Sequence, residues 1–361
     1  MKILLSIPDY NLINGVPELI PWCKAFFLNK AFIEQGHKIE IHYSSLFDEK
    51  QRIKILRQIQ KYKIGSVPIH LVQKIIDKQL FKSSSNTLLQ HAKYFSPNLI
   101  IFHDKTFFNK AILKKLKDSA DAKLILMIGT SPITLPNYIQ NTAPFFDYVF
   151  SSDYYHSITW QELGAKKSHC LPISACDRDY HKPYKFVNEY EKINFEYDIS
   201  FVGRLHSDLY ADRRRYLTNL CKKFNVAIYS PDYETIDNYP ILKKNYKGTA
   251  HREKMIKAIS ASKISLNFHG QTVQSGGNLK LFEIPATNTL QIVDRYNSNW
   301  FQEGKEIVSF DDLNDLIKKI EYYLDNEVDR KKIAKAGQIR VYEQHTYAKR
   351  MEKMLKIIYD T

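Results

Sequence analysis

The hydrophobic pattern of the chain alternates between short apolar runs and longer segments in which apolar residues recur every three to four positions. The short runs are typical of buried strands and the longer segments of amphipathic helices. Because the two kinds alternate, the pattern predicts parallel strands joined by crossover helices. In the first half the predicted strands are Lys2–Ile7, Lys38–Tyr43, Asn98–His103, Lys123–Ile128 and Asp147–Ser151.

A helix is predicted between the first two strands, over Leu19–Gln35. Gly36 follows its last apolar turn, and a glycine just past such a segment is a helix stop signal. The span Glu49–Lys93 is polar with helical period, and residues 83–86 have the composition of a loop within it.

A second series of elements follows the charged, turn-rich segment Pro183–Tyr197, which reads as a linker. Its predicted strands are Tyr197–Gly203, Val226–Tyr229, Lys263–Phe268, Leu290–Val293 and Ile307–Ser309. From Asp311 onward the chain is strongly helical, with Asp311-Asp312 as a candidate N-cap. The fold class is therefore α/β, with two Rossmann-like domains in tandem. We also expect C-terminal helices that pack back toward the N-terminal domain.

The length of 361 residues agrees with this division, because domains of about 150–200 residues are common. We predict an N-terminal domain over residues 1–185, a C-terminal domain over 186–345, and a C-terminal helix over 346–361 that crosses back. Ligands of parallel sheets collect at the carboxyl ends of the strands. With two such domains, the expected site is the cleft that they face.

The composition is that of a compact globular protein, with 44% hydrophobic and 25% charged residues. The apolar segment at the start of the chain is short and lacks a cleavage site, so we predict a strand there and not a signal peptide. No uncharged apolar run reaches the roughly 18–20 residues of a membrane helix. Four cysteines without metal-ligand spacing indicate reduced thiols and a cytoplasmic protein. Peripheral contact with the inner face of the membrane is a second possible location.

The net charge of +14 indicates an anionic neighbour. Nucleic acid, an anionic membrane surface and a phosphorylated substrate are the candidates, and general solubility is an equal alternative. The basic residues are spread along the chain and form no aromatic-basic recognition motif, which disfavours nucleic acid. No GxGxxG motif is present, so a dinucleotide cofactor is not expected.

Polar residues at predicted strand ends supply the candidate site of the first half. The loop after the first strand carries Asp9, Asn14 and Gly15, which could contact an acceptor, although a plain connecting loop explains it equally well. His103 and Asp104 end another strand, where either could deprotonate a sugar hydroxyl as a catalytic base. Asp104 could instead simply cap the following helix.

Weaker candidates end two further strands of this half, at Ser131 and at Ser152-Asp153.

The second half carries a stronger pattern. Gly203 and Arg204 directly follow a strand, where a guanidinium could bind a diphosphate. The segment 268–283 leads from a strand through Gly276 and Gly277 into a helix, an arrangement suited to a nucleotide phosphate. Lys280 adds a positive charge there, and Glu283 could accept both hydroxyls of a ribose. The run Asp212–Arg215 reads as a solvated helix face.

Five segments together resemble the GT-B glycosyltransferases, in particular the family typified by the spore maturation protein CgeB. They are Tyr197–Arg204, Lys247–Glu253, Asn278–Ala286, Gly304–Asp312 and Glu343–Tyr347. The resemblance covers the C-terminal half, and the first half shares only the strand pattern. It implies a C-terminal domain that holds a nucleotide-sugar donor, guessed to be of the UDP type, and an N-terminal domain that meets the acceptor.

The resemblance also implies roles for single residues. The donor-binding set would be Gly203, Arg204, His251, His269, Gly277, Asn278, Lys280 and Glu283. Arg204 and Lys280 would neutralise the diphosphate, Glu283 would bind the ribose, and the loop at His251 would lie near the base. Many retaining members carry an acidic residue where this chain has Ser275, so the stereochemical outcome stays open. No metal and no cofactor are expected, because cationic side chains stabilise the leaving diphosphate.

The function predicted is a metal-independent, hexosyltransferase-like activity. It would move a sugar from a nucleotide diphosphate-sugar to a hydroxyl of a cell-surface glycan, glycolipid or protein. The first alternative is a non-catalytic nucleotide-sugar-binding protein, with Ser275 as the sign of lost catalysis. The second is a nucleic-acid-directed glycosyltransferase or binding protein, suggested by the charge.

Overall fold

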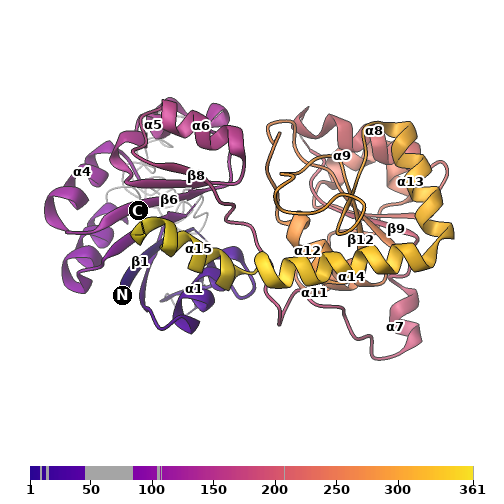
Figure 1. Ribbon diagram of the computed structural model, residues 1–361, viewed down its shortest axis with the longest axis horizontal. Coiled ribbons are helices and arrows are strands. Elements are labelled where there is room, and N and C mark those ends of the chain that lie inside the picture. Colours follow the sequence, from indigo (N-terminus) through magenta and orange to yellow (C-terminus); the bar gives the residue numbers. More distant parts are fainter. Residues whose placement is uncertain are drawn as a thin grey trace, which may run out of the picture. The chain divides into compact units, whose positions relative to one another are not determined.

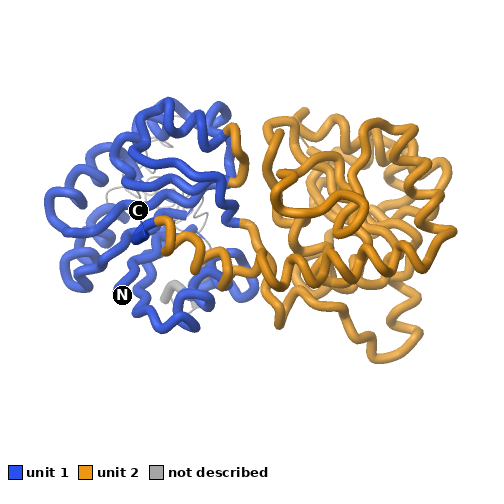
Figure 2. Tube along the Cα trace, viewed as in Figure 1, with its two compact units in different colours: residues 1–151, 156–173, 358–361 blue, residues 152–155, 174–357 orange. Residues whose placement is uncertain are grey.

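The computed structural model describes residues 1–8, 10–13, 16–44, 84–103, 106, 108–206 and 208–360. The chain forms two compact units, drawn in different colours in Figure 2. Unit 1 comprises residues 1–151, 156–173 and 358–361, and unit 2 comprises residues 152–155 and 174–357. The functional division predicted at residues 185 and 345 stays a prediction.

Unit 1 is built on a six-stranded sheet in the order β4-β1-β5-β6-β7-β8, in which every neighbouring pair is parallel (Figure 1). The strands are β1 (Lys2–Ile7), β4 (Lys38–Tyr43), β5 (Leu99–His103), β6 (Lys123–Ile128), β7 (Tyr148–Ser151) and β8 (Ser168–Cys170). All five predicted strands are confirmed. The central strands are buried along almost their whole length, as continuous apolar runs require in a parallel sheet.

The described helices of this unit are α1 (Lys24–Glu34), α4 (Lys110–Ser119), α5 (Asn137–Gln140) and α6 (Tyr154–Glu162), whose first two residues group with unit 2. A further helix covers residues 84–95, where a loop was predicted at 83–86, so that prediction was wrong for its described part.

Helix α1 begins later than the apolar pattern predicted. Val16–Leu19 forms strand β3, which pairs antiparallel with β2 (Tyr10–Ile13). The helix starts only after Cys23, whose sulfur accepts a hydrogen bond from the Phe26 amide at 3.4 Å. Its end agrees with the prediction, because Gly36 adopts the left-handed conformation with φ of 77°.

Unit 2 is built on a five-stranded parallel sheet in the order β10-β9-β11-β12-β13. The strands are β9 (Ile199–Val202), β10 (Val226–Tyr229), β11 (Ile264–Asn267), β12 (Leu290–Val293) and β13 (Val308–Ser309). The second predicted series is thereby confirmed. The helices are α7 (Glu189–Ile193), α8 (Ala211–Leu220), α9 (Tyr233–Asp237), α10 (Pro240–Lys244), α11 (Glu253–Ser260), α12 (Lys280–Ala286), α13 (Leu313–Asp325), α14 (Glu327–Gln344) and α15 (Tyr347–Tyr359).

Helix α13 starts where its sequence provides a capping side chain. Asp312 caps α13, with one carboxylate oxygen accepting from the amides of Asn314 and Asp315 at 2.8 and 2.9 Å. Such a cap stabilises a helix by about 1 kcal/mol. The last residues of α15 group with unit 1, where the Ile358 carbonyl accepts from the Lys123 ammonium at 3.0 Å. The chain end therefore returns to the N-terminal sheet, as predicted.

No helix among the described residues combines the length and the apolar character that crossing a bilayer requires.

Two buried histidines make the folding stability of the protein depend on pH. His42 hydrogen-bonds Ser6 and the Ser84 carbonyl, and burial lowers its pKa to about 4. In unit 2, burial and the charge of Arg350 lower the pKa of His345 to about 3. Both are neutral when folded and bind a proton near pH 6.5 when unfolded, so their stabilisation is complete above pH 6.5 and is lost as the pH falls.

We expect the free energy of unfolding to fall by about 1–2 kcal/mol per histidine between pH 7 and pH 5. Thermal unfolding at both pH values measures this loss. In His42→Asn, which can still donate to the Ser84 carbonyl, the loss should be smaller than in the wild type. A melting temperature that is equal at pH 7 and pH 5 would contradict the prediction.

Candidate functional site

Polar loops follow three adjacent strands of the unit 2 sheet. Residues 203–206 follow β9, residues 268–279 follow β11, and Asp294 follows β12. Because these strands are parallel neighbours, their carboxyl ends lie along the same edge of the sheet. Most of the predicted donor-binding residues are on these loops or on helix α12, which follows the second one.

Gly203 and Arg204 have different roles at the end of β9. A Cβ atom at Gly203 would lie 2.8 Å from the Phe201 ring, so packing within the protein already requires glycine there. The side chain of Arg204 is 59% exposed, and its Nη1 lies 3.2 Å from a carboxylate oxygen of Asp232. The Arg204 guanidinium therefore remains accessible to an anionic ligand, as the predicted diphosphate contact requires.

The loop after β9 is held by arginines of α8. Arg213 donates to the Arg204 carbonyl at 2.8 Å, and Arg214 donates to the Leu205 carbonyl at 2.5 Å. Arg213 is buried, and its guanidinium lies 4.0 Å from the centre of the Tyr210 ring. The prediction of a solvated face was therefore wrong for Arg213, which fixes the backbone that carries Arg204.

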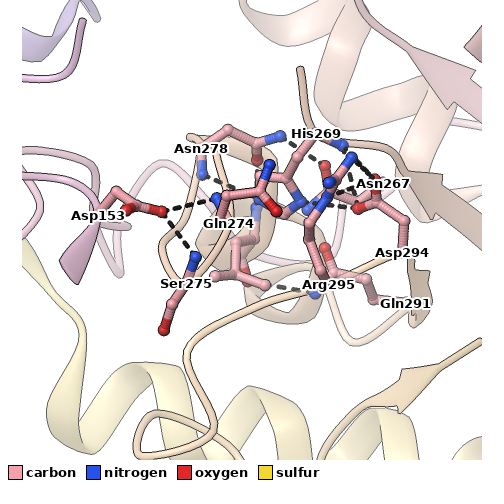
Figure 3. Close-up of polar contacts among 10 residues, drawn as sticks. Asp153, Asn267, His269, Gln274, Ser275, Asn278, Gln291, Asp294 and Arg295 are labelled. Carbon is pink, nitrogen blue, oxygen red and sulfur yellow. Dashed lines mark hydrogen bonds and ion pairs between the residues drawn. The ribbon is translucent and has the colours of Figure 1, made fainter. Parts of the chain in front are cut away.

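A buried aspartate-histidine pair supports the loop after β11. The His269 side chain is fully buried, and its Nδ1 lies 2.8 Å from a carboxylate oxygen of Asp294. Its Nε2 accepts the amide hydrogen of Asn278 at 3.3 Å, so Nδ1 carries the proton and donates to Asp294 (Figure 3). Although burial raises the pKa of Asp294, His269 and Arg295 lower it overall.

This geometry corrects the predicted role of His269. Both ring nitrogens are engaged within the chain, and no part of the ring is exposed to a ligand. His269 therefore positions the Asn278 backbone and does not contact the donor directly.

A second carboxylate holds the same loop from residues 152–155 of unit 2. Asp153 is fully buried, and its Oδ2 accepts the amide hydrogens of Gln274 at 2.9 Å and of Ser275 at 2.7 Å (Figure 3). Its Oδ1 accepts from the Tyr155 amide at the start of α6. Asp153, a weak candidate in the sequence, thus fixes the loop by its backbone.

The two glycines of this loop are required by close packing. A Cβ atom at Gly276 would lie 2.3 Å from the Ser152 carbonyl oxygen, and one at Gly277 would lie 2.5 Å from Leu281. Gly276 also forms a bridge with Asp153, and the Gly277 amide donates to the Ser152 carbonyl at 3.0 Å. Contacts within the chain thus account for the Gly277 predicted at the donor site.

Asn278 connects the loop to helix α12. Its carboxamide oxygen accepts from the Leu281 amide at 3.1 Å, in the first turn of the helix. Its nitrogen donates to the Asn267 side-chain oxygen at 2.7 Å, at the end of β11. The side chain predicted to face the phosphates is therefore engaged in starting α12 next to the sheet.

Glu283 and Lys280 form an ion pair on α12, in which Glu283 is buried and Lys280 is half-buried. Their carboxylate and ammonium groups are 2.5 Å apart, and the Lys280 ammonium also lies 3.0 Å from the Met255 sulfur. The other Glu283 oxygen lies 3.5 Å from Nε2 of the buried His181. Burial alone raises the pKa of Glu283, but Lys280 and His181 lower it to about 2, so the carboxylate is charged at neutral pH.

The remaining predicted residues are not brought together with this group by any contact of the described residues. His251 is exposed and precedes Arg252, whose φ of 53° marks a strained start of α11. His103 lies in unit 1, buried at the end of β5. The acceptor-side residues Asp9, Asn14 and Gly15, together with Asp104, lie outside the described residues.

Sequence reasoning missed His181 and Asp294, which hold Glu283 and His269. A position directly after a predicted strand could have indicated Asp294, whereas no motif marks His181. No group of three or more metal-ligating side chains occurs within the described ranges.

The GT-B fold of this chain is evident from solved structures. The chain aligns with Anabaena HepE in complex with UDP-glucose at a TM-score of 0.66 and 11% identity, over 100% of both chains. The alignment with sucrose-phosphate synthase from Thermosynechococcus elongatus has a TM-score of 0.64 and 11% identity, over 99% of both chains. The alignment with the structure described as trehalose-6-phosphate from E. coli bound with UDP-2-fluoro glucose has a TM-score of 0.66 and 11% identity, also over 99% of both chains. The predicted architecture of two Rossmann-like domains is confirmed.

The sequence of the C-terminal half gives the class of the protein. Residues 213–356 match the family described as glycosyl transferase-like. The matched residues include helix α12 with Lys280 and Glu283. The predicted glycosyltransferase class is thereby confirmed. No curated protein sequence matches the chain.

Proposed function

We propose that this protein transfers a hexose-type sugar from a nucleotide diphosphate donor to a hydroxyl group of an acceptor. The observation that supports this most directly is the Glu283 carboxylate, which is charged, nearly buried and held at the carboxyl edge of the unit 2 sheet. A fixed carboxylate is suited to accept two vicinal hydroxyls of a ribose. The exposed Arg204 on the same sheet edge would bind the diphosphate together with Lys280.

The proposed donor is of the UDP type. HepE was solved with UDP-glucose, and the E. coli structure with UDP-2-fluoro glucose. In the proposed reaction, the positive charges of Arg204 and Lys280 stabilise the negative charge that develops on the departing diphosphate. A metal ion is not needed for this stabilisation, so we propose a metal-independent transfer.

The acceptor side is proposed from sequence alone. His103 or Asp104 would act as the base that removes the hydroxyl proton, and Asp9, Asn14 and Gly15 would contact the acceptor. The acceptor itself would be a cell-surface glycan, glycolipid or protein. The net charge of +14 supports an anionic acceptor or an anionic membrane surface. The four cysteines without metal-ligand spacing support a cytoplasmic enzyme.

Within the class, we propose a relation to the CgeB-type glycosyltransferases. It is supported by the five motif segments of the C-terminal half. The functional division at residues 185 and 345 belongs to the same proposal, with donor binding in the second half and acceptor binding in the first.

A panel of nucleotide-sugars tests the proposal. Donors that bind the folded protein raise its melting temperature, so we expect one nucleotide class to stabilise it above all others. That donor should then release free nucleotide slowly in water and faster with an acceptor, measured by coupled nucleotide detection. Stabilisation without any release would favour the non-catalytic binding protein that Ser275 suggests, and no stabilisation by any donor would overturn both.

A further inference from the structure

The carboxylate of Glu283 is held by a residue far away in sequence. His181 belongs to the segment between β8 and α7, and its Nε2 lies 3.5 Å from Oε1 of Glu283. The other oxygen, Oε2, pairs with Lys280 at 2.5 Å. Two different partners thus fix the two oxygens of one carboxylate, and neither side chain of the His181–Glu283 pair is more than 8% exposed.

The tautomer of His181 follows from its second contact. Its Nδ1 accepts the amide hydrogen of Asp177 at 2.9 Å, so this nitrogen carries no proton. In the neutral ring the proton is then on Nε2, the nitrogen that lies 3.5 Å from Glu283. His181 is therefore placed to donate a long hydrogen bond to the carboxylate, and this contact helps to lower the pKa of Glu283.

The segment that carries His181 is itself tied down. The His181 amide donates to the Asp177 carbonyl at 2.7 Å, and the His181 carbonyl accepts from the Tyr342 hydroxyl at 2.9 Å. The same hydroxyl lies 3.0 Å from the carbonyl of Ala286, the last residue of α12. The donor atom of His181 and the helix of Glu283 are therefore fixed with respect to each other.

The number of lone pairs connects this arrangement to ribose binding. A carboxylate offers about four acceptor positions. Lys280 and His181 each take one, on different oxygens, so each oxygen retains a position for one hydroxyl. To bind two vicinal hydroxyls, both carboxylate oxygens of Glu283 must be held in a fixed orientation. A carboxylate held by only one of its oxygens could rotate out of that orientation.

We propose that His181 is a positioning residue that makes the nucleotide site selective for ribose over sugars without the 2′ and 3′ hydroxyls. The proposal rests on the proposed function, because it assigns Glu283 to the ribose of the donor. It adds the prediction that selectivity for the vicinal diol depends on the imidazole of His181 and not on Glu283 and Lys280 alone.

The test compares dissociation constants of UDP, GDP and ADP with those of their 2′,3′-dideoxy counterparts by calorimetry. In His181→Phe, which keeps a ring beside Tyr180 but donates no hydrogen bond, the preference for the ribose form should fall about tenfold. In His181→Gln, whose amide can donate from a position similar to Nε2, most of the preference should return.

Tyr184→Phe is the matched control, because it removes from the same segment a hydroxyl that donates to Glu253 at 3.2 Å and does not contact His181. It should leave the ribose preference unchanged. If His181→Phe weakens the binding of ribose and dideoxy nucleotides equally, or leaves the preference for ribose unchanged, the inference about His181 is overturned. The proposed function is not affected by either result. Should His181→Phe fail to fold, loss of the ribose preference in His181→Gln, or absence of that preference in the wild type, overturns the inference. Absence of nucleotide binding to the wild type would overturn the proposed function as well.

Discussion

Replacing Glu283 by alanine is expected to weaken nucleotide binding about 100-fold. A hydrogen bond to a charged group contributes roughly 1.5–3 kcal/mol, so losing two ribose hydroxyl contacts costs about 3 kcal/mol. The change also leaves the Lys280 ammonium without its carboxylate in a largely buried position. Calorimetric titration of the best donor from the nucleotide-sugar panel measures the effect.

Two further variants sharpen this prediction. Glu283→Gln keeps the size of the side chain but loses the charge. The NH₂ group of the new amide must face Lys280 or His181, both of which present hydrogens. Nucleotide binding should therefore again be strongly weakened. Glu321→Ala removes an exposed glutamate of α13 that pairs with Lys223, and should leave affinity unchanged. Unaltered affinity in Glu283→Ala would refute the assignment of the ribose site.

The fold could be predicted because its strands are continuous apolar runs. A strand buried on both faces must be apolar throughout, so β1, β6 and β10 stand out from the polar segments between them. Strand β8 was missed because Ser168–Cys170 is short and mostly polar. Strand β3 was missed because the predicted helix began at Leu19, and the residues before it were assigned to the loop after the first strand.

The site could be predicted only where a motif is local. Lys280 and Glu283 follow a glycine-rich entrance to a helix, which sequence alone associates with phosphate and ribose. His181 lies far from Glu283 along the chain, and Asp153 lies far from the loop that it holds. Contacts of this kind depend on how loops return to one sheet edge, and no local pattern encodes them. His269 was assigned to the donor site only through the family resemblance, whereas its burial against Asp294 shows that it holds the loop.

Replacing Asp294 by alanine is expected to destabilise unit 2 by about 3 kcal/mol. The change leaves both the backbone amide and the Nδ1 hydrogen of His269 buried without an acceptor, and each unsatisfied group costs about 1–3 kcal/mol. For a unit of this size the melting temperature should fall by roughly 10 °C. Thermal unfolding followed by circular dichroism measures the shift.

Asp294→Asn separates charge from hydrogen bonding at the same position. Its amide can accept from the His269 backbone, but its NH₂ group would face Nδ1 and favour the tautomer with hydrogen on Nε2. That hydrogen would then oppose the Asn278 amide, which donates to Nε2 in the wild type. We therefore expect faster hydrogen exchange at Asn278 in this variant, together with weaker donor binding, because Asn278 leads into the helix of Lys280 and Glu283.

Arg295→Ala is the control for both substitutions at Asp294. Arg295 contacts the same carboxylate at 3.2 Å but is partly exposed, so its removal should cost less than about 1 kcal/mol. An Asp294→Ala variant that melts within a degree or two of Arg295→Ala would show that the pair with His269 contributes little. Slow exchange at Asn278 in Asp294→Asn would show that the tautomer of His269 does not control the loop. A large loss in Asp294→Ala with rapid exchange in Asp294→Asn would instead establish that a buried proton position sets the geometry of the donor loop.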